Sequence, residues 1–218
     1  MDKKLIEKLQ SFGVIPVIAV ESVDTARSLA RALIAGGLPV AEITFRTAAA
    51  ADVIQMLAQE FPEIMVGAGT ILTVENLERA IKSGATFGVA PGFNPAIVRK
   101  AAELGLPFMP GVATPTEIEA ALSAGCKALK FFPAGEMGGV KMLKALSAPY
   151  KHTGVRFMPT GGVKPDNLAE YLSVDTVMVC GGTWVATKDA MAAGNWDAIT
   201  AACRDAVASV RKARETGK

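Results

Sequence analysis

The chain has 218 residues, of which 50% are hydrophobic and 20% are charged, and its 23 basic and 21 acidic side chains leave a formal net charge of +2. This composition can fill a hydrophobic core and lacks the low hydrophobicity and high net charge of a disordered protein. The sequence has no basic stripe and only 6% aromatic residues for stacking on bases, so no nucleic-acid partner is expected.

The apolar segments are short. The longest uninterrupted one, residues 14–20, contains Pro16, whereas a membrane-spanning helix needs about 20 apolar residues. The first residues also lack the pattern of a secretory signal. The sequence therefore predicts a cytoplasmic protein with no membrane partner.

Short apolar or β-branched runs alternate with helical segments along the chain. They begin at intervals of 20–27 residues, which is enough for one strand, one helix and two short loops. The eight predicted strands are residues 14–20, 40–45, 64–68, 87–90, 107–112, 128–132, 155–158 and 176–180. Helix starts are predicted at Ser22, Thr73, Thr114 and Pro165, and a last helix over about 196–214. Eight repeats favour an α/β fold with a single (β/α)8 TIM barrel of parallel strands, spanning residues 1–218 with a helix at its N-terminus.

The second predicted strand carries polar side chains where a barrel interior is usually apolar. Successive side chains of a strand point to opposite faces. The apolar residues of this strand alternate with Glu42, Thr44 and Arg46. If the apolar set packs on the helices, these three side chains point inward.

The sixth predicted strand repeats this arrangement. Leu129 and Phe131 take the helix-facing positions, so Lys130 points inward. Strands two and six contribute to the same interior layers from opposite walls of a barrel, so Glu42 and Lys130 are expected to face each other.

A buried ion pair between Glu42 and Lys130 has two interpretations. It can be structural, although a buried pair adds little stability because removing both charges from water is costly. It can also be catalytic, because both residues lie toward the carboxyl ends of their strands, where this fold places its active sites. We favour the catalytic interpretation, in which the apolar Phe132 and the cationic Arg46 help Lys130 to become a neutral nucleophile.

Small residues end several other predicted strands. The third strand ends in Gly67-Ala68-Gly69-Thr70, the fourth in Ala90-Pro91-Gly92, the seventh in Pro159-Thr160-Gly161-Gly162 and the eighth in Gly181-Gly182-Thr183. The loops after strands seven and eight frequently form phosphate sites in this fold, because glycines let backbone N–H groups approach an anion. The sequence therefore predicts an anion site in these two loops.

Histidine and cysteine are scarce. His152 is the one histidine, and Cys126, Cys180 and Cys203 are separated by 54 and 23 residues. These spacings match neither a metal-binding motif nor a disulfide framework, and one histidine does not favour a multi-histidine metal site or a Ser-His-Asp triad. Free thiols and no metal are expected.

Motifs along most of the chain, taken together, resemble one family. They are Gly13–Ile18, Ala41–Thr47, Val66–Thr70, Pro91-Gly92, Lys130–Ala134, Arg156–Val163 and Gly181–Trp184. The chain resembles the class I aldolases that act on 2-keto-3-deoxy-6-phosphogluconate (KDPG) and 4-hydroxy-2-oxoglutarate (KHG). Where the family commonly has Glu directly after Phe-Phe-Pro-Ala, this chain has Gly135 before Glu136. The resemblance therefore assigns no role to Glu136.

The resemblance implies a lyase of the Entner–Doudoroff pathway, a homotrimer that needs no cofactor. It implies a Schiff base on Lys130 and acid–base catalysis by Glu42. The implied substrate contacts are Arg46 and Thr70 for the carboxylate, Gly161, Gly162 and Thr183 for the phosphate, and Pro91, Phe132 and Thr160 elsewhere in the site.

The expected reaction is reversible cleavage of KDPG, a phosphosugar 2-keto acid, to pyruvate and glyceraldehyde 3-phosphate. Cleavage of KHG to pyruvate and glyoxylate is a second expected activity.

Two alternatives remain open at this point. The chain can be another phosphate-binding barrel enzyme, an epimerase or synthase in which Glu42 is a base and Lys130 only its electrostatic partner. It can also be a non-catalytic assembly subunit engineered on this scaffold.

Overall fold

The computed structural model describes residues 3–216, and strands and helices alternate throughout this part of the chain. The strands are β1 (Val14–Ile18), β2 (Val40–Thr44), β3 (Met65–Gly69), β4 (Gly88–Val89), β5 (Phe108–Met109), β6 (Gly111–Val112), β7 (Ala128–Phe131), β8 (Arg156–Pro159) and β9 (Cys180–Gly182). The helices are α1 (Lys3–Phe12), α2 (Val23–Ala35), α3 (Ala50–Glu60), α4 (Val74–Lys82), α5 (Pro95–Glu103), α6 (Pro115–Ser123), α7 (Gly139–Ser147), the 3-10 helix η1 (Ala148–Thr153), α8 (Leu168–Leu172), α9 (Lys188–Ala192) and α10 (Trp196–Thr216).

The strands pair in parallel and form two sheets. One sheet has the order β5-β4-β3-β2-β1-β9 and the other has the order β6-β7-β8. Two isolated parallel bridges, Phe157–Val177 and Thr160–Gly181, join the β8 region to the β9 region. The prediction of an α/β fold with parallel strands is therefore confirmed.

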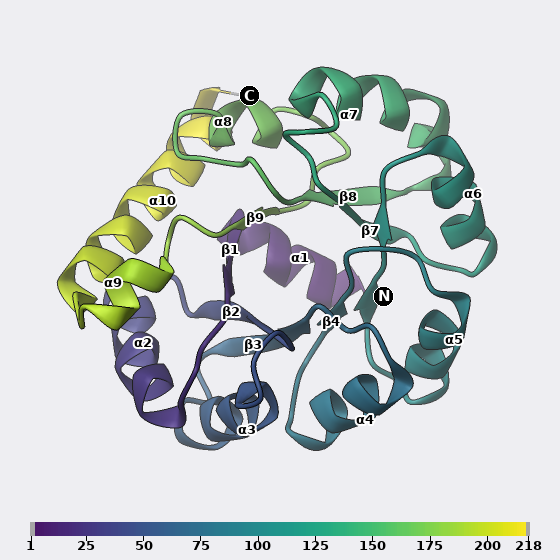
Figure 1. The fold of residues 1–218 in the computed structure, drawn as a ribbon. Helices are drawn as coiled ribbons and strands as arrows, with labels where there is room; N and C mark the ends of the chain where they lie inside the picture. Colours follow the sequence, from purple (N-terminus) through teal and green to yellow (C-terminus); the bar gives the residue numbers. More distant parts are fainter. Residues whose placement is uncertain (1–2, 217–218) are drawn as a thin grey trace.

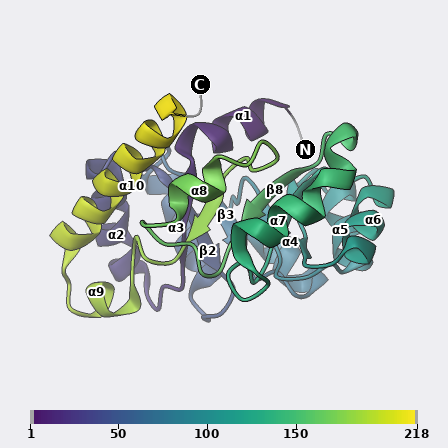
Figure 2. The same ribbon diagram turned by 90° about the horizontal axis from the view of Figure 1, so that it is seen from above.

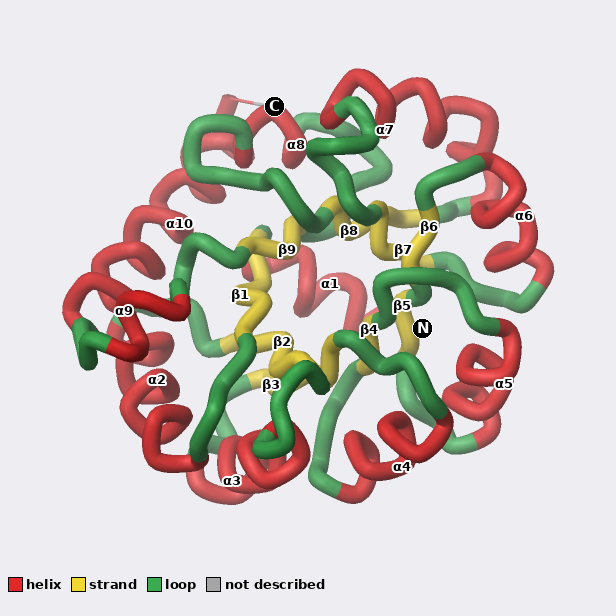
Figure 3. The backbone as a smooth tube through the Cα atoms, viewed as in Figure 1, coloured by secondary structure: helices red, strands yellow, loops and turns green. Residues whose placement is uncertain are grey.

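The helices surround the strands (Figure 1). Figure 3 shows the strands around the centre of the molecule and most of the helices at its periphery. Helix α1 lies on the opposite side of the molecule from α9 (Figure 2). Because the chain passes from α1 directly into β1, α1 covers the amino ends of the strands. The carboxyl ends of the strands and the loops that follow them therefore lie on the other side.

Most predicted strand boundaries lie within two residues of the observed ones, and three predicted elements differ further. The fifth predicted strand is divided into β5 and β6 by Pro110, which has no backbone N–H for a sheet. The eighth predicted strand, 176–180, only overlaps β9, and Val177 pairs through an isolated bridge. Helix α8 begins at Leu168, because Asn167 accepts a hydrogen bond from the backbone of Lys164 and so keeps the preceding residues in a turn.

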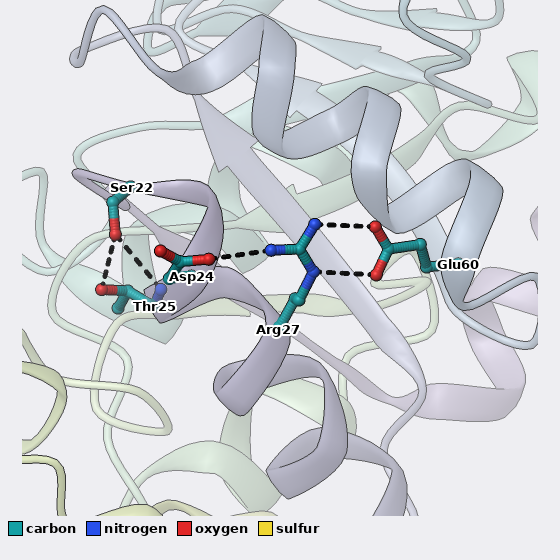
Figure 4. Close-up of polar contacts among 5 residues, drawn as sticks. All are labelled: Ser22, Asp24, Thr25, Arg27 and Glu60. Carbon is teal, nitrogen blue, oxygen red and sulfur yellow. Dashed lines mark hydrogen bonds and ion pairs between the residues drawn. The ribbon is translucent and has the colours of Figure 1, made fainter.

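Side-chain contacts fix α2 on its neighbour α3 (Figure 4). Ser22 caps α2, because its hydroxyl oxygen accepts a hydrogen bond of 3.2 Å from the backbone N–H of Thr25. Arg27 donates from Nε and Nη2 to the two carboxylate oxygens of Glu60, at 2.8 and 2.9 Å, and from Nη1 to Asp24 at 2.8 Å. These hydrogen bonds hold the pKa of Glu60 below its usual range.

The core of the molecule is apolar with a few polar exceptions. The buried polar and charged residues are Glu42, Thr44, Lys130, Ser147, Thr160 and Thr176. Four of the six come from β2, β7 or the residue that follows β8. Within residues 3–216, no helix is long and apolar enough to cross a membrane.

Candidate active site

Lys130 and Glu42 meet inside the molecule. Lys130 lies on β7 and is 5% exposed, and Glu42 lies on β2 and is 0% exposed. Lys130 Nζ is 3.4 Å from Glu42 Oε1. Two strands far apart in the sequence thus bring an ammonium and a carboxylate together, as the side-chain alternation predicts.

The surroundings of Lys130 are partly aromatic. Phe132 follows β7, and the centroid of its ring lies 5.3 Å from Lys130 Nζ. Such a contact attracts a cation to the negative face of the ring, so it does not supply the help toward a neutral Lys130 that the sequence led us to expect from Phe132. Phe132 is half-buried, and its ring forms one side of the surroundings of Lys130.

The Glu42 carboxyl group has two different oxygens. Oε1 faces Lys130, whereas Oε2 is buried and has no hydrogen-bond partner among the residues that the structure describes. A buried carboxylate oxygen without a partner is costly. It is therefore a ready acceptor for a proton from a bound molecule.

Arg46 lies at the rim of the site. The residue is exposed, and its Nε donates a hydrogen bond of 3.1 Å to Thr44 Oγ1. The Thr44 hydroxyl in turn donates to the backbone oxygen of Ile18 at 3.1 Å. Thr44 therefore orients the guanidinium, while the remaining donors of Arg46 can bind an anion such as a carboxylate.

Thr70 and Pro91 follow strands β3 and β4. Thr70 is half-buried and has a φ of 57°, which is rare for a β-branched residue and marks local backbone strain. Pro91 is half-buried, and its carbonyl group packs so closely against Gly111 that a Cβ there would overlap it. Gly111 pairs with Lys130 across β6 and β7, so Pro91 is fixed near the lysine strand.

The loops after β7 and β8 contact each other through their backbones. The Ala134 and Gly135 N–H groups donate to the carbonyl oxygens of Thr160 and Gly161, at 2.8 and 2.7 Å. Gly162 has a φ of 80°, and a Cβ built on it would lie 2.8 Å from the Gly135 Cα. Only glycine fits such a close approach at positive φ. The loop that carries Phe132 is thus joined to the predicted phosphate loop.

Thr160 and Thr183 differ in their surroundings. Thr160 is buried, and its hydroxyl lies where a Cβ of Gly181 on β9 would otherwise be. Thr183 follows β9 and is exposed. Glu136, in the loop after β7, is exposed as well. All the predicted site residues therefore lie on the carboxyl-end side of the strands, with Arg46 and Thr183 at its edge.

Two features of this region were not predicted from the sequence. Thr44 was expected to point inward, but nothing in the sequence indicated that it hydrogen-bonds to Arg46. Gly69 belongs to a glycine-rich strand end, a pattern that does not indicate its contact with the Glu42 carboxyl group. The side-chain alternation of β2 and β3 could have indicated both contacts. Thr44 and Gly69 are paired in the strand register, so both lie beside the inward-facing side chains of β2.

Of the three cysteines, Cys180 directly precedes Gly181, which packs against Thr160. Cys180 and Cys203 are buried, and burial raises the pKa of the Cys203 thiol to about 12 and that of Cys180 far above its usual range. All three cysteines are free thiols. Within residues 3–216, no group of three or more His, Cys, Asp or Glu side chains is placed to hold a metal ion.

The chain is similar to known proteins along most of its length. Residues 5–202 match the family model described as KDPG and KHG aldolase. The chain is 47% identical to the 2-dehydro-3-deoxy-phosphogluconate aldolase of Treponema pallidum, covering 90% of this chain and 93% of that protein. It is 42% identical to the KHG/KDPG aldolase of Escherichia coli, covering 89% and 90% of the two chains.

A solved structure is similar over nearly the same length. The KDPG aldolase of Legionella pneumophila, with pyruvate captured at low pH as a covalent carbinolamine intermediate, superimposes with a TM-score of 0.87 at 36% identity. The similarity covers 91% of this chain and 96% of that one. The chain belongs to the KDPG and KHG aldolase family.

Proposed function

We propose that the chain is a class I aldolase that reversibly cleaves KDPG to pyruvate and glyceraldehyde 3-phosphate. The observation that carries the proposal is the contact between the buried Lys130 amine and the Glu42 carboxylate at the carboxyl ends of the strands. The relatives that bear the name of this activity and the pyruvate carbinolamine of the Legionella pneumophila enzyme support it.

The first step forms a covalent bond between enzyme and substrate. Lys130 first passes one proton to Glu42, and its neutral amine then attacks the C2 ketone and gives a carbinolamine. Glu42 donates a proton to the C2 hydroxyl, which leaves as water, and the product is a protonated imine. The imine carries a positive charge next to the bond that will break.

The second step breaks the C3–C4 bond. Glu42, now a carboxylate, accepts the proton of the C4 hydroxyl, and the free oxygen Oε2 is the available acceptor. The C3–C4 electron pair moves into the imine and forms an enamine. The aldehyde product, glyceraldehyde 3-phosphate, is released.

The third step regenerates the enzyme. Glu42 returns its proton to C3 of the enamine, which becomes the imine of pyruvate. Water adds to C2 of this imine, Glu42 accepts the proton that is set free, and the resulting carbinolamine breaks down to pyruvate and the free Lys130 amine. The sum of the three steps is KDPG converted to two products, with no net gain or loss of protons by the enzyme.

Substrate recognition is divided between the rim and the loops. Arg46, oriented by Thr44, and the strained Thr70 bind the carboxylate of the 2-keto acid. The N–H groups around Gly161 and Gly162, with the hydroxyl of Thr183, bind the distal phosphate. Pro91, Phe132 and Thr160 form the walls between these two ends.

The proposal extends to the architecture and the assembly. A closed (β/α)8 barrel, formed by one domain over residues 1–218, is supported by the two bridges between the β8 and β9 regions and by the direct passage from β5 to β6. A homotrimer without a cofactor, in the cytoplasm, agrees with the family. KHG is the proposed second substrate, supported by the name of the Escherichia coli relative.

The comparisons do not favour an epimerase, a synthase or a non-catalytic assembly subunit. Release of pyruvate from KDPG, measured with a lactate dehydrogenase coupled assay, tests the proposal. The wild-type chain is expected to turn over, and Lys130→Gln is expected to lose turnover while remaining folded. A wild-type chain without turnover, or a Lys130→Gln variant that retains it, would contradict the proposal.

A further inference from the structure

Gly69, the last residue of β3, lies against the Glu42 carboxyl group. A Cβ atom built on Gly69 would overlap Glu42 Oε1 and would lie 2.7 Å from both Cγ and Cδ of the same side chain. Protein interiors do not tolerate such overlap without movement of one partner. Since Glu42 is fully buried, its carboxyl group has no open solvent to move into.

Backbone conformation does not account for this glycine. The φ of Gly69 lies outside the left-handed region, so other residues can adopt the same backbone. The residue with a positive φ is the next one, Thr70. What Gly69 contributes is therefore the space that a side chain would take.

That space determines where the two oxygens of Glu42 lie. Oε1, which a Cβ at position 69 would overlap, is also the atom 3.4 Å from Lys130 Nζ. Oε2 has no partner among the residues that the structure describes. We infer that Gly69 is a positioning residue. Because it has no side chain, the Glu42 carboxylate can lie with one oxygen against Lys130 and the other free for the substrate proton. This inference rests on the proposed acid–base role of Glu42.

The substitution Gly69→Ala adds one methyl group at this contact. It should displace the carboxylate and lower the rate at which the enzyme exchanges the methyl hydrogens of pyruvate with D2O, by about 10²–10⁴-fold. Lys130 stays paired with β6 and β8 on either side of its strand, so pyruvate and borohydride should still label it at the end point. NMR of pyruvate measures the exchange, and peptide mass measures the label.

A second substitution separates positioning from general packing. Glu42→Asp removes one methylene and withdraws the carboxylate from position 69. The methyl group added by Gly69→Ala is expected to act by displacing the carboxylate, which Glu42→Asp withdraws. The double variant should therefore exchange hydrogen faster than the rate calculated by multiplying the effects of the two single substitutions. The matched control is Gly88→Ala on β4, where a Cβ would lie 2.7 Å from the Phe108 ring instead of meeting Glu42. Its effect should combine with that of Glu42→Asp without such coupling.

The outcomes separate this inference from the proposed function. Gly69→Ala with exchange within about threefold of wild type, or with purely multiplicative effects in the double variant, would overturn the inference. A wild-type chain with neither label nor exchange would instead overturn the proposed function. If Gly69→Ala fails to fold, recovery of folding and exchange by Glu42→Asp supports the inference, and no recovery overturns it.

Discussion

The proposed chemistry depends on one carboxylate with two different oxygens. Glu42 Oε1 lies 3.4 Å from Lys130 Nζ, and Oε2 is buried without a partner among the described residues. A structural ion pair would satisfy both oxygens, because each one left unpaired in the interior costs stability. In the proposed mechanism, the C4 hydroxyl of the substrate is the partner of Oε2.

Replacing Glu42 with Gln tests this role. The substitution keeps the size of the side chain and removes the titratable group, so kcat for KDPG cleavage should fall by about 10²–10⁴-fold. Thermal unfolding should show a folded protein. The matched control is Glu136→Gln, because Glu136 is an exposed glutamate in the loop after β7 and should be dispensable. Near-native turnover by Glu42→Gln would make Glu42 a structural partner of Lys130.

Residues that interrupt a pattern can be predicted from the sequence, and residues that complete a contact cannot. Glu42 and Lys130 stand out because each replaces an apolar residue on an inward face. The hydrogen bond from Arg46 to Thr44 depends on rotamers at the end of β2, which no spacing specifies. The role of Gly69 depends on the position of a side chain on the neighbouring strand.

The helices and strands around the site form where capping residues and apolar runs predict them, although some begin or end at other residues than predicted. Thr73 and Thr114 cap α4 and α6 where the sequence predicts helix starts. The fifth strand is divided because Pro110 cannot donate to a sheet. The shift of β9 to Cys180–Gly182 was not predicted, because glycines have low β-propensity and are held in the strand by pairing with β1.

The loop after β8 gives a test of the proposed phosphate site. Gly162→Asp adds a negative charge facing the proposed phosphate and a Cβ 2.8 Å from the Gly135 Cα. kcat/KM for phosphorylated KDPG should fall far more than that for unphosphorylated KHG. Pyruvate should still be trapped on Lys130.

The substitution Gly162→Ala is the matched control, because it adds the Cβ without the charge. A larger loss in Gly162→Asp than in Gly162→Ala, confined to the phosphorylated substrate, assigns the difference to charge. Equal losses for both substrates in a folded Gly162→Asp variant would indicate a turn residue only.

The contact between α2 and α3 predicts a pH dependence of stability. Hydrogen bonds from Arg27 lower the pKa of Glu60 from its ordinary value of 4.5. The ion pair therefore stabilises the fold above pH 4.5, and this contribution is lost as the pH falls through the lowered pKa. Glu60→Gln should lower Tm at neutral pH, and the difference from wild type should shrink below pH 4.5.

The exposed Glu63, which follows α3, provides the control for that measurement. Glu63→Gln should leave Tm close to the wild-type value across the same pH range. A Tm difference between Glu60→Gln and wild type that stays constant down to about pH 2 would show that the ion pair does not contribute.

The molecule as a whole brings together residues that are 88 positions apart in the chain, Glu42 and Lys130. Their meeting was predicted from the number of repeats, because strands two and six of an eight-strand barrel contribute to the same interior layers. The strand pairing within the two sheets was not predictable in the same way. It depends on individual backbone hydrogen bonds near Pro110 and between the β8 and β9 regions.

The central claim is that Lys130 forms a Schiff base with the 2-keto acid. Incubation with pyruvate and borohydride, followed by peptide mass mapping, tests it directly, because reduction makes an imine permanent. We expect one reduced adduct per chain, on the peptide that carries Lys130, and none when borohydride is omitted. An adduct on Lys141 or Lys144 in place of Lys130, or no adduct at all, would contradict the assignment.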